Sequence, residues 1–303
     1  MTRKSTYTEQ FKIHLERLGY GKSSQSMLPA CVYEFLDKLE EIGIYHVNDI
    51  QAQHIQTHYE YLTQRPNRRK PGGLSSRMIT HHLYAIRLFL NYQEQTGAIT
   101  ENPISGLYFP KPESKEREIL TIEEIKQLYE TCETHREKAI IGLFYGCGLR
   151  RSEGVVLNVK DISFGSSLLY VREGKGNKRR VVPINEKVKD DFKNYLYNER
   201  FAKKHASTEH SRSETAFITN SIGKRANGNS LNLAFKIILV RSSFPLSGER
   251  VGGFSLHNLR HSIATHLLEN GLSVEYVRDF LGHKHLEATQ IYTRISKKRL
   301  SEL

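Results

Sequence analysis

Residues 254–296 decide the fold, and they read FSLHNLRHSIATHLLENGLSVEYVRDFLGHKHLEATQIYTRIS. Apolar residues recur on a 3.6-residue period over 259–268, which predicts an amphipathic helix that ends at Asn270-Gly271. Ser273 is a typical helix cap and predicts a second helix, which Gly282 terminates. We therefore expect two short helices in succession, with polar side chains grouped on their outer faces.

Four polar residues of this stretch carry chemistry. His257 and Arg260 lie three residues apart, on one helical turn, His283 follows the second helix, and Tyr292 comes nine residues later. Transfer of a phosphodiester without hydrolysis needs cationic donors, a proton source and a nucleophile that stays attached. Arginine binds two phosphate oxygens, histidine exchanges protons near neutral pH, and a tyrosine phenol can form the covalent link.

Simpler interpretations exist for each residue alone. Tyrosine in a helix usually packs, and the chain contains sixteen tyrosines. His257 and His261 have the spacing of two zinc ligands, but the residues between them include Arg260 and no glutamate, which disfavours a metal. The joint spacing of the four residues, and not any single one, favours phosphoryl chemistry without a metal.

Composition limits the class of protein. The chain has 303 residues, enough for two domains, and a formal charge of +12, which favours a polyanionic partner such as nucleic acid over a merely basic protein. Cys31, Cys132 and Cys147 are scattered and predict free thiols in a reducing compartment. No apolar run approaches the length of a membrane span, so we expect a cytoplasmic protein without membrane contact.

The first part of the chain, residues 1–101, predicts an all-helical domain. We expect one helix near residues 11–18, a second that starts no earlier than Pro29, a third capped by Asp49 and a fourth opened by Ser75. A basic cluster follows the third helix and continues onto the fourth; it is either a solvated surface or a contact to a DNA backbone, and its candidate residues are Arg68, Arg69, Lys70, Arg77 and Arg87.

Residues 102–118 carry three prolines and mixed charge, which predicts an extended linker able to pass around a DNA duplex. After it, residues 119–303 predict a mixed domain. A capping box at Thr121–Glu124 opens a helix, and a buried helix over 139–145 runs into a glycine-rich turn. Arg150 follows that turn, and Glu153, three residues on, can hold its side chain in place.

Strands are predicted over 167–171 and 179–184, joined by a glycine-rich hairpin with Lys175 at its tip. Residues 216–219 are a candidate for another strand, and Ser230 is expected to cap a helix that runs through Leu239. Lys224 and Arg225, just before that helix, are further candidates for contact with a DNA backbone.

Four motifs, in this order, resemble those of the tyrosine recombinases, or integrases, most closely the bacterial Xer-like members: GCGLRRSE, GKGNKRRVVPI, HNLRHSIATHLLENG and LGHKHLEATQIYT. The resemblance covers the whole chain. It implies a mainly α fold with a small antiparallel β-sheet: an N-terminal all-helical, SAM-like core-binding domain and a C-terminal mixed α+β catalytic domain. Eleven residues follow Tyr292, fewer than in members that pass a C-terminal helix to a neighbouring subunit.

The resemblance also implies a role for each catalytic position. Arg150 and Arg260 bind the scissile phosphate, with Glu153 supporting the first arginine. Lys175 protonates the leaving 5′ oxygen, His257 and His283 assist proton transfer, and Tyr292 forms a 3′-phosphotyrosyl bond. No metal and no cofactor is implied.

As partners, the family implies double-stranded DNA with inverted-repeat sites and a homotetramer on synapsed DNA that exchanges strands through a Holliday junction. The free protein is then expected to be a monomer, and an accessory recombinase or directionality factor is possible. Two other hypotheses stay open on the sequence alone. One is a regulatory or architectural DNA-binding protein on the same fold, and the other is a type IB topoisomerase-like enzyme that relaxes DNA.

Overall fold

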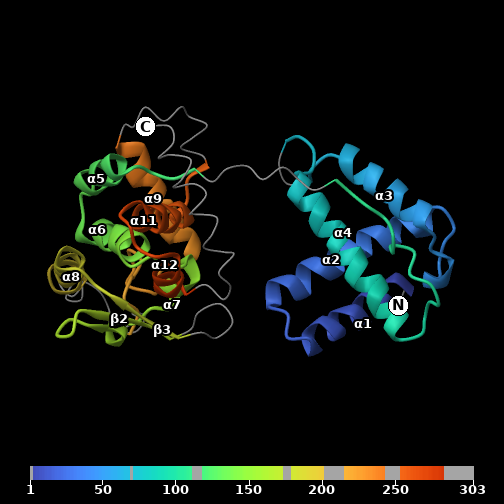
Figure 1. Ribbon diagram of the computed structural model, residues 1–303, viewed down its shortest axis with the longest axis horizontal. Coiled ribbons are helices and arrows are strands. Elements are labelled where there is room, and N and C mark those ends of the chain that lie inside the picture. The colour runs from blue at the N-terminus through green and yellow to red at the C-terminus, as the bar shows by residue number, and fades with distance from the viewer. Residues whose placement is uncertain are drawn as a thin grey trace. The chain divides into compact units, whose positions relative to one another are not determined.

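The computed structural model describes residues 3–68, 71–110, 118–172, 179–200, 215–242 and 253–282. The chain forms two compact units, residues 1–115 and 116–303, and Figure 1 draws the helices and strands of each. The described part of the first unit is helical, and that of the second combines helices with a three-stranded antiparallel sheet. This confirms the predicted class, a mainly α protein with a small antiparallel sheet.

Amphipathic helices build the first unit. They are α1 (Arg3–Arg17), α2 (Lys22–Glu41), α3 (Ala52–Gln64) and α4 (Ser76–Gln95), with a short 3-10 turn, η1 (Val47–Asp49), before α3. Their buried faces meet in one apolar core, in which Phe11 of α1 and Phe89 of α4 pack edge to face, 5.7 Å between ring centres. Ser75 caps α4 by accepting a hydrogen bond from the Met78 amide, as its sequence position predicts.

Two of the predicted boundaries in this unit are wrong. Helix α2 starts at Lys22 and continues through Pro29, which is buried inside it, because the packed apolar face compensates for the hydrogen bond that proline cannot donate. Asp49 does not cap α3; it ends η1, and Gln51 takes the capping position before Ala52. In both cases tertiary packing outweighs the local signal.

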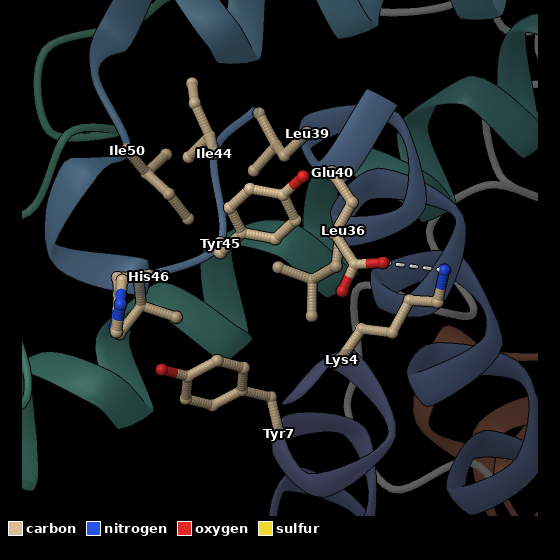
Figure 2. Close-up of a pocket in the computed structure, with 10 residues that line it drawn as sticks. Lys4, Tyr7, Leu36, Leu39, Glu40, Ile44, Tyr45, His46 and Ile50 are labelled. Carbon is tan, nitrogen blue, oxygen red and sulfur yellow. Dashed lines mark ion pairs between the residues drawn. The ribbon is translucent and has the colours of Figure 1, made fainter. Parts of the chain in front are cut away.

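A small pocket lies where α1 and α2 approach the segment before η1, and Figure 2 shows its lining. Lys4 of α1 reaches across to α2, with its Nζ 2.8 Å from Glu40 Oε2 and 2.5 Å from Asp37 Oδ1. The hydrogen bonds that Lys4 donates to these two carboxylates raise its pKa. The pocket is therefore a gap between packed helices, and the two ion pairs of Lys4 link α1 to α2 beside it.

Buried histidines mark the contact of α2, α3 and α4. His58 and His82 are each 3% exposed, and their ring centres lie 6.4 Å apart. Arg65 pairs with Glu34 at 2.6 Å, and Glu34 in turn lies 4.0 Å from His82. Burial, followed by the charges of His82 and Arg65, lowers the pKa of His58 to about 3. Both rings therefore belong to the core of this unit, where apolar side chains are the usual choice.

The start of the expected linker packs on the first unit. Ile104 is 3% exposed and lies in its core, where Leu107 and Phe109 pack against it, and Phe109 stands 5.0 Å from the ring of Tyr59. The apolar residues of this segment thus extend the core beyond Gln95, while residues 111–117 lie outside the described residues.

The second unit begins with helices. They are α5 (Ile122–Glu130), α6 (His135–Ile141) continued by a wider turn η2 (Gly142–Gly146), α7 (Arg151–Val156) and the short turn η3 (Val159–Asp161). The predicted capping box opens α5, since the Thr121 hydroxyl accepts from the Glu124 amide and the Glu124 carboxylate accepts from the Thr121 amide. The buried helix expected over 139–145 corresponds to α6 and η2.

The sheet follows, with the order β1 (Ile162–Ser163), β2 (Leu168–Val171) and β3 (Arg180–Pro183), all antiparallel. The predicted hairpin is confirmed, with Leu169 paired with Val182 and Val171 with Arg180; its connection, residues 173–178, lies outside the described residues. Strand β1 was not predicted, because two residues are too few to show an alternating pattern.

The remaining elements are helices. They are α8 (Glu186–Lys193) continued by η4 (Asn194–Arg200), α9 (Gly228–Arg241), α11 (Leu256–Glu269) and α12 (Val274–Leu281). The two helices predicted within 254–296 are therefore confirmed, with Asn270 and Gly282 at their ends. Among the described residues, none of the helices has the length and apolarity needed to cross a membrane.

Two further predictions in this unit are wrong. Residues 216–219 form no strand, because their backbone is satisfied by two separate partners: the Phe217 amide donates to Leu157, and the Ala226 amide donates to Ile218. Helix α9 is capped by Asn227, whose side chain accepts from the Ser230 amide, so Ser230 lies inside the first turn. Both residue types cap helices, and the asparagine comes first.

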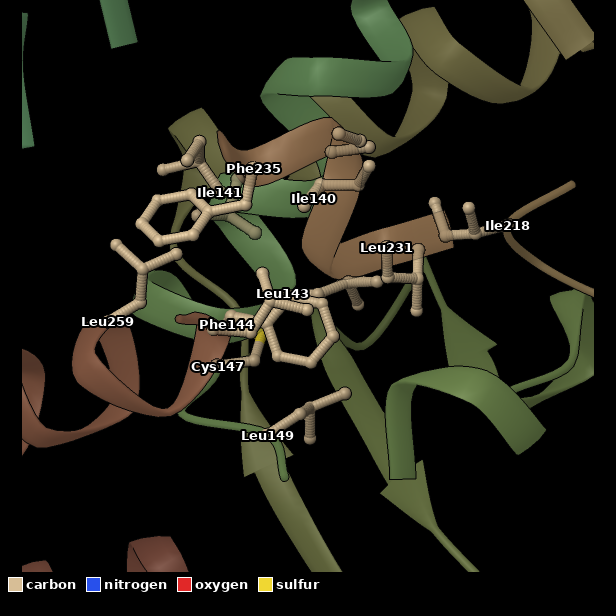
Figure 3. Packing of buried hydrophobic residues seen from close by; sticks show 14 of the residues in the cluster. Ile140, Ile141, Leu143, Phe144, Cys147, Leu149, Ile218, Leu231, Phe235 and Leu259 are labelled. Carbon is tan, nitrogen blue, oxygen red and sulfur yellow. The ribbon is translucent and has the colours of Figure 1, made fainter. Parts of the chain in front are cut away.

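One apolar core holds the second unit together. Figure 3 shows Ile141 of α6, Phe144 of η2, Phe235 of α9 and Leu259 of α11 meeting within it. An added Cβ on Gly154 of α7 would lie 2.6 Å from the ring of Phe144, so this helix sits as close to the core as backbone allows. The core thereby fixes α7, which carries Glu153 and directly follows Arg150, and α11, which carries Arg260.

Candidate active site

A tight turn presents Arg150. Gly148 has a φ of 57°, and a Cβ there would lie 2.8 Å from Cε1 of Phe280 on α12, so glycine is required both by conformation and by space. The turn places Arg150 at the N-cap of α7, with extended backbone angles. The glycines predict a projecting side chain; in the structure the Arg150 side chain is 17% exposed and is held by Glu153 and the Gly282 carbonyl.

Glu153, in the first turn of α7, anchors Arg150. Its Oε2 accepts from the Arg150 amide at 2.8 Å, and its Oε1 accepts from Arg150 Nη1 at 2.8 Å. The carboxylate is almost completely enclosed, with its side chain 1% exposed. Burial alone would raise the pKa of Glu153, but hydrogen bonds and charge from Arg180, and then hydrogen bonds from Arg150, outweigh it and lower the pKa to about 2. The group is a carboxylate at neutral pH.

Arg260 reaches the same place from α11. It is 2% exposed, and its Nη1 donates to the Gly148 carbonyl while its Nη2 donates to the Leu281 carbonyl at 2.6 Å. Its Nη1 also lies 3.9 Å from Glu153 Oε2. Thus Arg260, which lies 110 positions after Arg150 in the chain, joins the group formed by Arg150 and Glu153.

The end of α12 supplies acceptors for both arginines. Arg150 Nη2 donates to the Gly282 carbonyl at 2.8 Å, next to the Leu281 carbonyl that Arg260 contacts. The last carbonyls of a helix lack partners inside the helix and carry partial negative charge, so they attract guanidinium groups. His283 follows directly, which makes the α12 terminus the common neighbour of three predicted catalytic positions.

One residue of this group was missed from the sequence. Arg180, the first residue of β3, donates from Nη1 and Nη2 to the two oxygens of Glu153, both at 2.9 Å, and from Nε to the Phe280 carbonyl at 3.0 Å. A signal was present, because Arg180 alternates in phase with Val182, which is fully buried. An arginine at an inward-facing strand position needs a buried partner.

His257 lies in the first turn of α11 and is exposed, while Arg260, one turn further, is buried. The rings of His257 and His261 are nearly parallel, with centres 6.5 Å apart. Across the part of the chain that the structure describes, no cluster of three histidine, cysteine or acidic side chains has the arrangement of a metal site.

Three predicted catalytic residues, Lys175, His283 and Tyr292, lie outside the described residues, as do Arg69 and Lys70. Of the other DNA-contact candidates, four are exposed on their units: Arg68, Arg77, Arg87 and Lys224. Arg225 differs. Its guanidinium donates to the carbonyls of Val155 and Leu157 and to Asn158 Oδ1, at 2.6 to 3.1 Å. We therefore assign Arg225 to the fold and not to the DNA surface.

The described site is an enclosed cluster of positive charge. Three guanidinium groups, from Arg150, Arg180 and Arg260, surround the single carboxylate of Glu153. The excess positive charge suits an anion with several acceptor oxygens. The N–H groups of an arginine guanidinium have the spacing needed to donate to two oxygens of a phosphate. The arrangement can therefore hold a phosphate and stabilise negative charge that develops on it.

Comparisons with known proteins agree with this geometry. Residues 118–299, more than half of the chain, match the model of the phage integrase family. The chain is 30% identical over 274 residues to tyrosine recombinase XerC of Oceanobacillus iheyensis, covering 88% of this chain and 84% of that protein. It is 31% identical over 236 residues to tyrosine recombinase XerA of Pyrococcus horikoshii, covering 77% of this chain and 74% of that protein.

Solved structures share the fold. The XerH recombinase, solved with a palindromic difH substrate in a post-cleavage complex, aligns with a TM-score of 0.72 at 19% identity, over 96% of this chain and 83% of that one. The Tn1549 transposon integrase, solved with circular intermediate DNA, aligns with a TM-score of 0.73 at 16% identity, over 96% of this chain and 95% of that one. From the matched family, the relatives and the fold, the chain belongs to the phage integrase family and is a tyrosine recombinase, an enzyme of site-specific DNA recombination.

Proposed function

We propose that this chain cleaves and rejoins double-stranded DNA at inverted-repeat sites, with Tyr292 as the nucleophile. The observation that carries the proposal is the convergence of Arg150 and Arg260 on the α12 terminus, which directly precedes His283. A phosphate held by both guanidinium groups would lie at the end of α12, ten residues before Tyr292 in the sequence. Two solved relatives in the fold comparison contain DNA, which supports DNA as the substrate.

The proposed first step is a transesterification. The Tyr292 phenolic oxygen attacks the phosphorus and forms a 3′-phosphotyrosyl bond, while the bond from phosphorus to the 5′ oxygen breaks. Lys175 gives the leaving oxygen its proton, and one of the two histidines, His257 or His283, takes the proton that the phenol loses. One phosphoester bond is exchanged for another, so a 5′-hydroxyl of a second strand can reverse the reaction and join a new partner.

Arg150 and Arg260 supply the electrostatic part of this step. Charge develops on the non-bridging oxygens in the transition state, and preorganised donors in an enclosed site stabilise it without reorganising. Both guanidinium groups are already held by carbonyls and by Glu153, so they meet the phosphate in a fixed orientation. By analogy with oxyanion donors, loss of either should slow cleavage by roughly 100- to 1,000-fold.

The assembly that we propose is a homotetramer on two synapsed sites, formed from monomers and exchanging strands pairwise through a Holliday junction, with an accessory factor where the direction is controlled. The exposed cations Arg68, Arg77, Arg87 and Lys224, together with Arg69 and Lys70, are the proposed contacts to the DNA backbone. We place the reaction in the cytoplasm, where the buried thiols of Cys31, Cys132 and Cys147 stay reduced.

The test is covalent trapping. DNA flanking the gene is incubated with the full chain, the covalent complexes are isolated, and their DNA ends are sequenced to map the cleavage site. A nicked oligonucleotide carrying that site then loses its short 3′ product and traps the adduct. Tyr292→Phe should abolish the adduct and keep DNA binding within about threefold. Tyr276→Phe, which removes a phenol that is 52% exposed on α12, is the matched control and should keep the adduct.

An undiminished adduct in Tyr292→Phe would refute the nucleophile. Relaxation of a supercoiled plasmid that lacks the mapped site would instead indicate a topoisomerase-like activity. Absence of any adduct with the unaltered chain, despite tight DNA binding, would overturn the proposed chemistry.

A further inference from the structure

The Arg180 side chain holds together three separate parts of the site. Its guanidinium forms a two-pronged pair with Glu153 of α7, at 2.9 Å to each oxygen, and its Nε reaches the Phe280 carbonyl near the end of α12. Its own backbone begins β3, five residues after Lys175. One side chain thus joins the base of the lysine hairpin, the helix that carries Glu153 and the helix that leads to His283.

The fit around Arg180 is close. Its side chain is 8% exposed, and a Cβ on Gly282 would lie 2.9 Å from Arg180 Cδ and 3.1 Å from its Nη1. Gly282 adopts a φ of 65°, and its carbonyl accepts from Arg150 Nη2. The arginine therefore packs against the same residue whose carbonyl orients Arg150, and only a glycine leaves it the space to do so.

Glu153 depends on Arg180 for its orientation. Both carboxylate oxygens are shared between Arg150 and Arg180, and the second oxygen also lies 3.9 Å from Arg260. Without Arg180, each oxygen would lose a charged donor at 2.9 Å, and the carboxylate could turn toward Arg260. Such a turn would release Arg150 Nη1, which is held by the oxygen that Arg180 Nη1 also contacts.

We propose that Arg180 is a positioning residue for strand cleavage, which fixes Glu153, and through it Arg150, while it ties the base of the Lys175 hairpin to the end of α12. The inference rests on the proposed function, because it assumes that Arg150 holds the scissile phosphate. Arg180 does not act on the phosphate itself: two of its nitrogens face Glu153 and a third faces the Phe280 carbonyl. Its effect on the reaction passes through its neighbours.

A double-mutant cycle tests that dependence. Arg180→Gln, Glu153→Gln and the double variant are compared with the unaltered full chain for adduct formation, under saturating concentrations of the nicked oligonucleotide with the mapped site. Misplacement of a phosphate-binding group by about 1 Å costs roughly 100-fold in rate, so we expect that loss for Arg180→Gln, with DNA affinity within threefold. The double variant should be no more than threefold slower than Glu153→Gln, because the two residues act in series.

Two further variants separate positioning from charge and from folding. Arg179→Gln removes the same charge from the exposed neighbouring position and should keep the cleavage rate within threefold. Arg180→Lys keeps the charge but cannot pair with both oxygens of Glu153, so it should recover part of the rate and not all of it. If the far-UV circular dichroism of Arg180→Gln shows that this variant does not fold, Arg180→Lys takes its place in the double-mutant cycle.

A second measurement needs no DNA. In ¹H–¹⁵N spectra of the free chain, the Nη–H signals of Arg150 should be slow to exchange, because Nη1 donates to Glu153 and Nη2 donates to the Gly282 carbonyl. They should broaden or shift in Arg180→Gln, while Arg179→Gln leaves them unchanged. The inference would be overturned if the rate loss of the double variant equalled the product of the two single losses. It would also be overturned if the Arg150 signals in Arg180→Gln were unchanged. If the unaltered chain forms no adduct but the Arg150 signals respond as expected, the proposed reaction fails while the positioning of Arg150 by Arg180 stands.

Discussion

The Glu153 carboxylate gives the sharpest prediction for stability. Arg180 and Arg150 lower its pKa from 4.5 to about 2, against the effect of burial. Because the folded state holds this proton less tightly than the unfolded chain, the group stabilises the fold above pH 4.5, and this contribution is lost as the pH falls toward 2. A difference of about 2.5 pKa units corresponds to about 3 kcal/mol, and the linkage relation places about 2 kcal/mol of that loss between pH 6 and pH 3.

The perturbation is Glu153→Gln, which keeps the shape and removes the charge. At pH 6 the variant loses the carboxylate that pairs with three arginines, and breaking a buried ion pair of this kind costs about 3 to 5 kcal/mol. At pH 3 the carboxyl of the unaltered chain becomes almost fully protonated on unfolding, so the two proteins should differ less. We therefore expect the difference in free energy of unfolding to shrink by about 2 kcal/mol from pH 6 to pH 3.

The assay is hydrogen exchange of backbone amides in α7 and β3 of the full chain, which reports the second unit separately from the first. The control is Glu133→Gln, whose side chain is 66% exposed and pairs with Arg241; it should change stability by less than about 1 kcal/mol at either pH. A difference between the unaltered chain and Glu153→Gln that stays constant from pH 6 to pH 3 would refute the reasoning.

Two other predictions concern the first unit and the DNA surface. Burial lowers the pKa of His58 to about 3, so the unfolded chain takes up a proton below pH 6.5 that the folded chain does not. The free energy of unfolding of the first unit should then fall by about 2 kcal/mol between pH 7 and pH 5, as measured by hydrogen exchange of the α3 and α4 amides. His58→Phe should remove this pH dependence. A pH dependence that is the same in His58→Phe and in the unaltered chain would contradict the prediction. Arg225→Gln should lower the free energy of unfolding of the second unit by about 2 kcal/mol and leave the salt dependence of DNA binding unchanged. Lys224→Gln should lower the slope of log K for DNA binding against log salt concentration by about 1 and leave unfolding unchanged. The reverse pattern would mean that Arg225 contacts DNA.

Much of the second unit is predictable because its signals are local. Ser273 and Gly282 bound α12, Thr121 and Glu124 form a capping box, and the glycine before Arg150 marks a turn. Serine, threonine and glutamate side chains accept backbone hydrogen bonds at a helix start, and glycine adopts the left-handed conformation at a helix end. Residues within a few positions therefore determine where the helix begins and ends. The pairing of Arg150 with Glu153 is of the same kind, since three residues separate them on one helix.

Other features depend on partners far along the chain. Pro29 lies within α2 because the helix is held by its packed face, which no local rule shows. Arg180 contacts Glu153, 27 residues away, and Phe280, 100 residues away. Its strand phase indicates an inward-facing arginine, but no local pattern identifies these partners. Likewise, Arg225 resembles a surface cation until Leu157 and Asn158 are seen to surround it.

The arginines of the site rest largely on main-chain oxygens, those of Gly148, Phe280, Leu281 and Gly282. A substitution at Phe280 or Leu281 changes the side chain and keeps the carbonyl oxygen in the backbone, whereas Gly148 and Gly282 have no room for a Cβ. A single inserted or deleted residue in α12 is different, because it would turn the helix end by about 100° and shift it by about 1.5 Å. A change in the length of this helix would therefore displace the carbonyls that hold all three arginines at once.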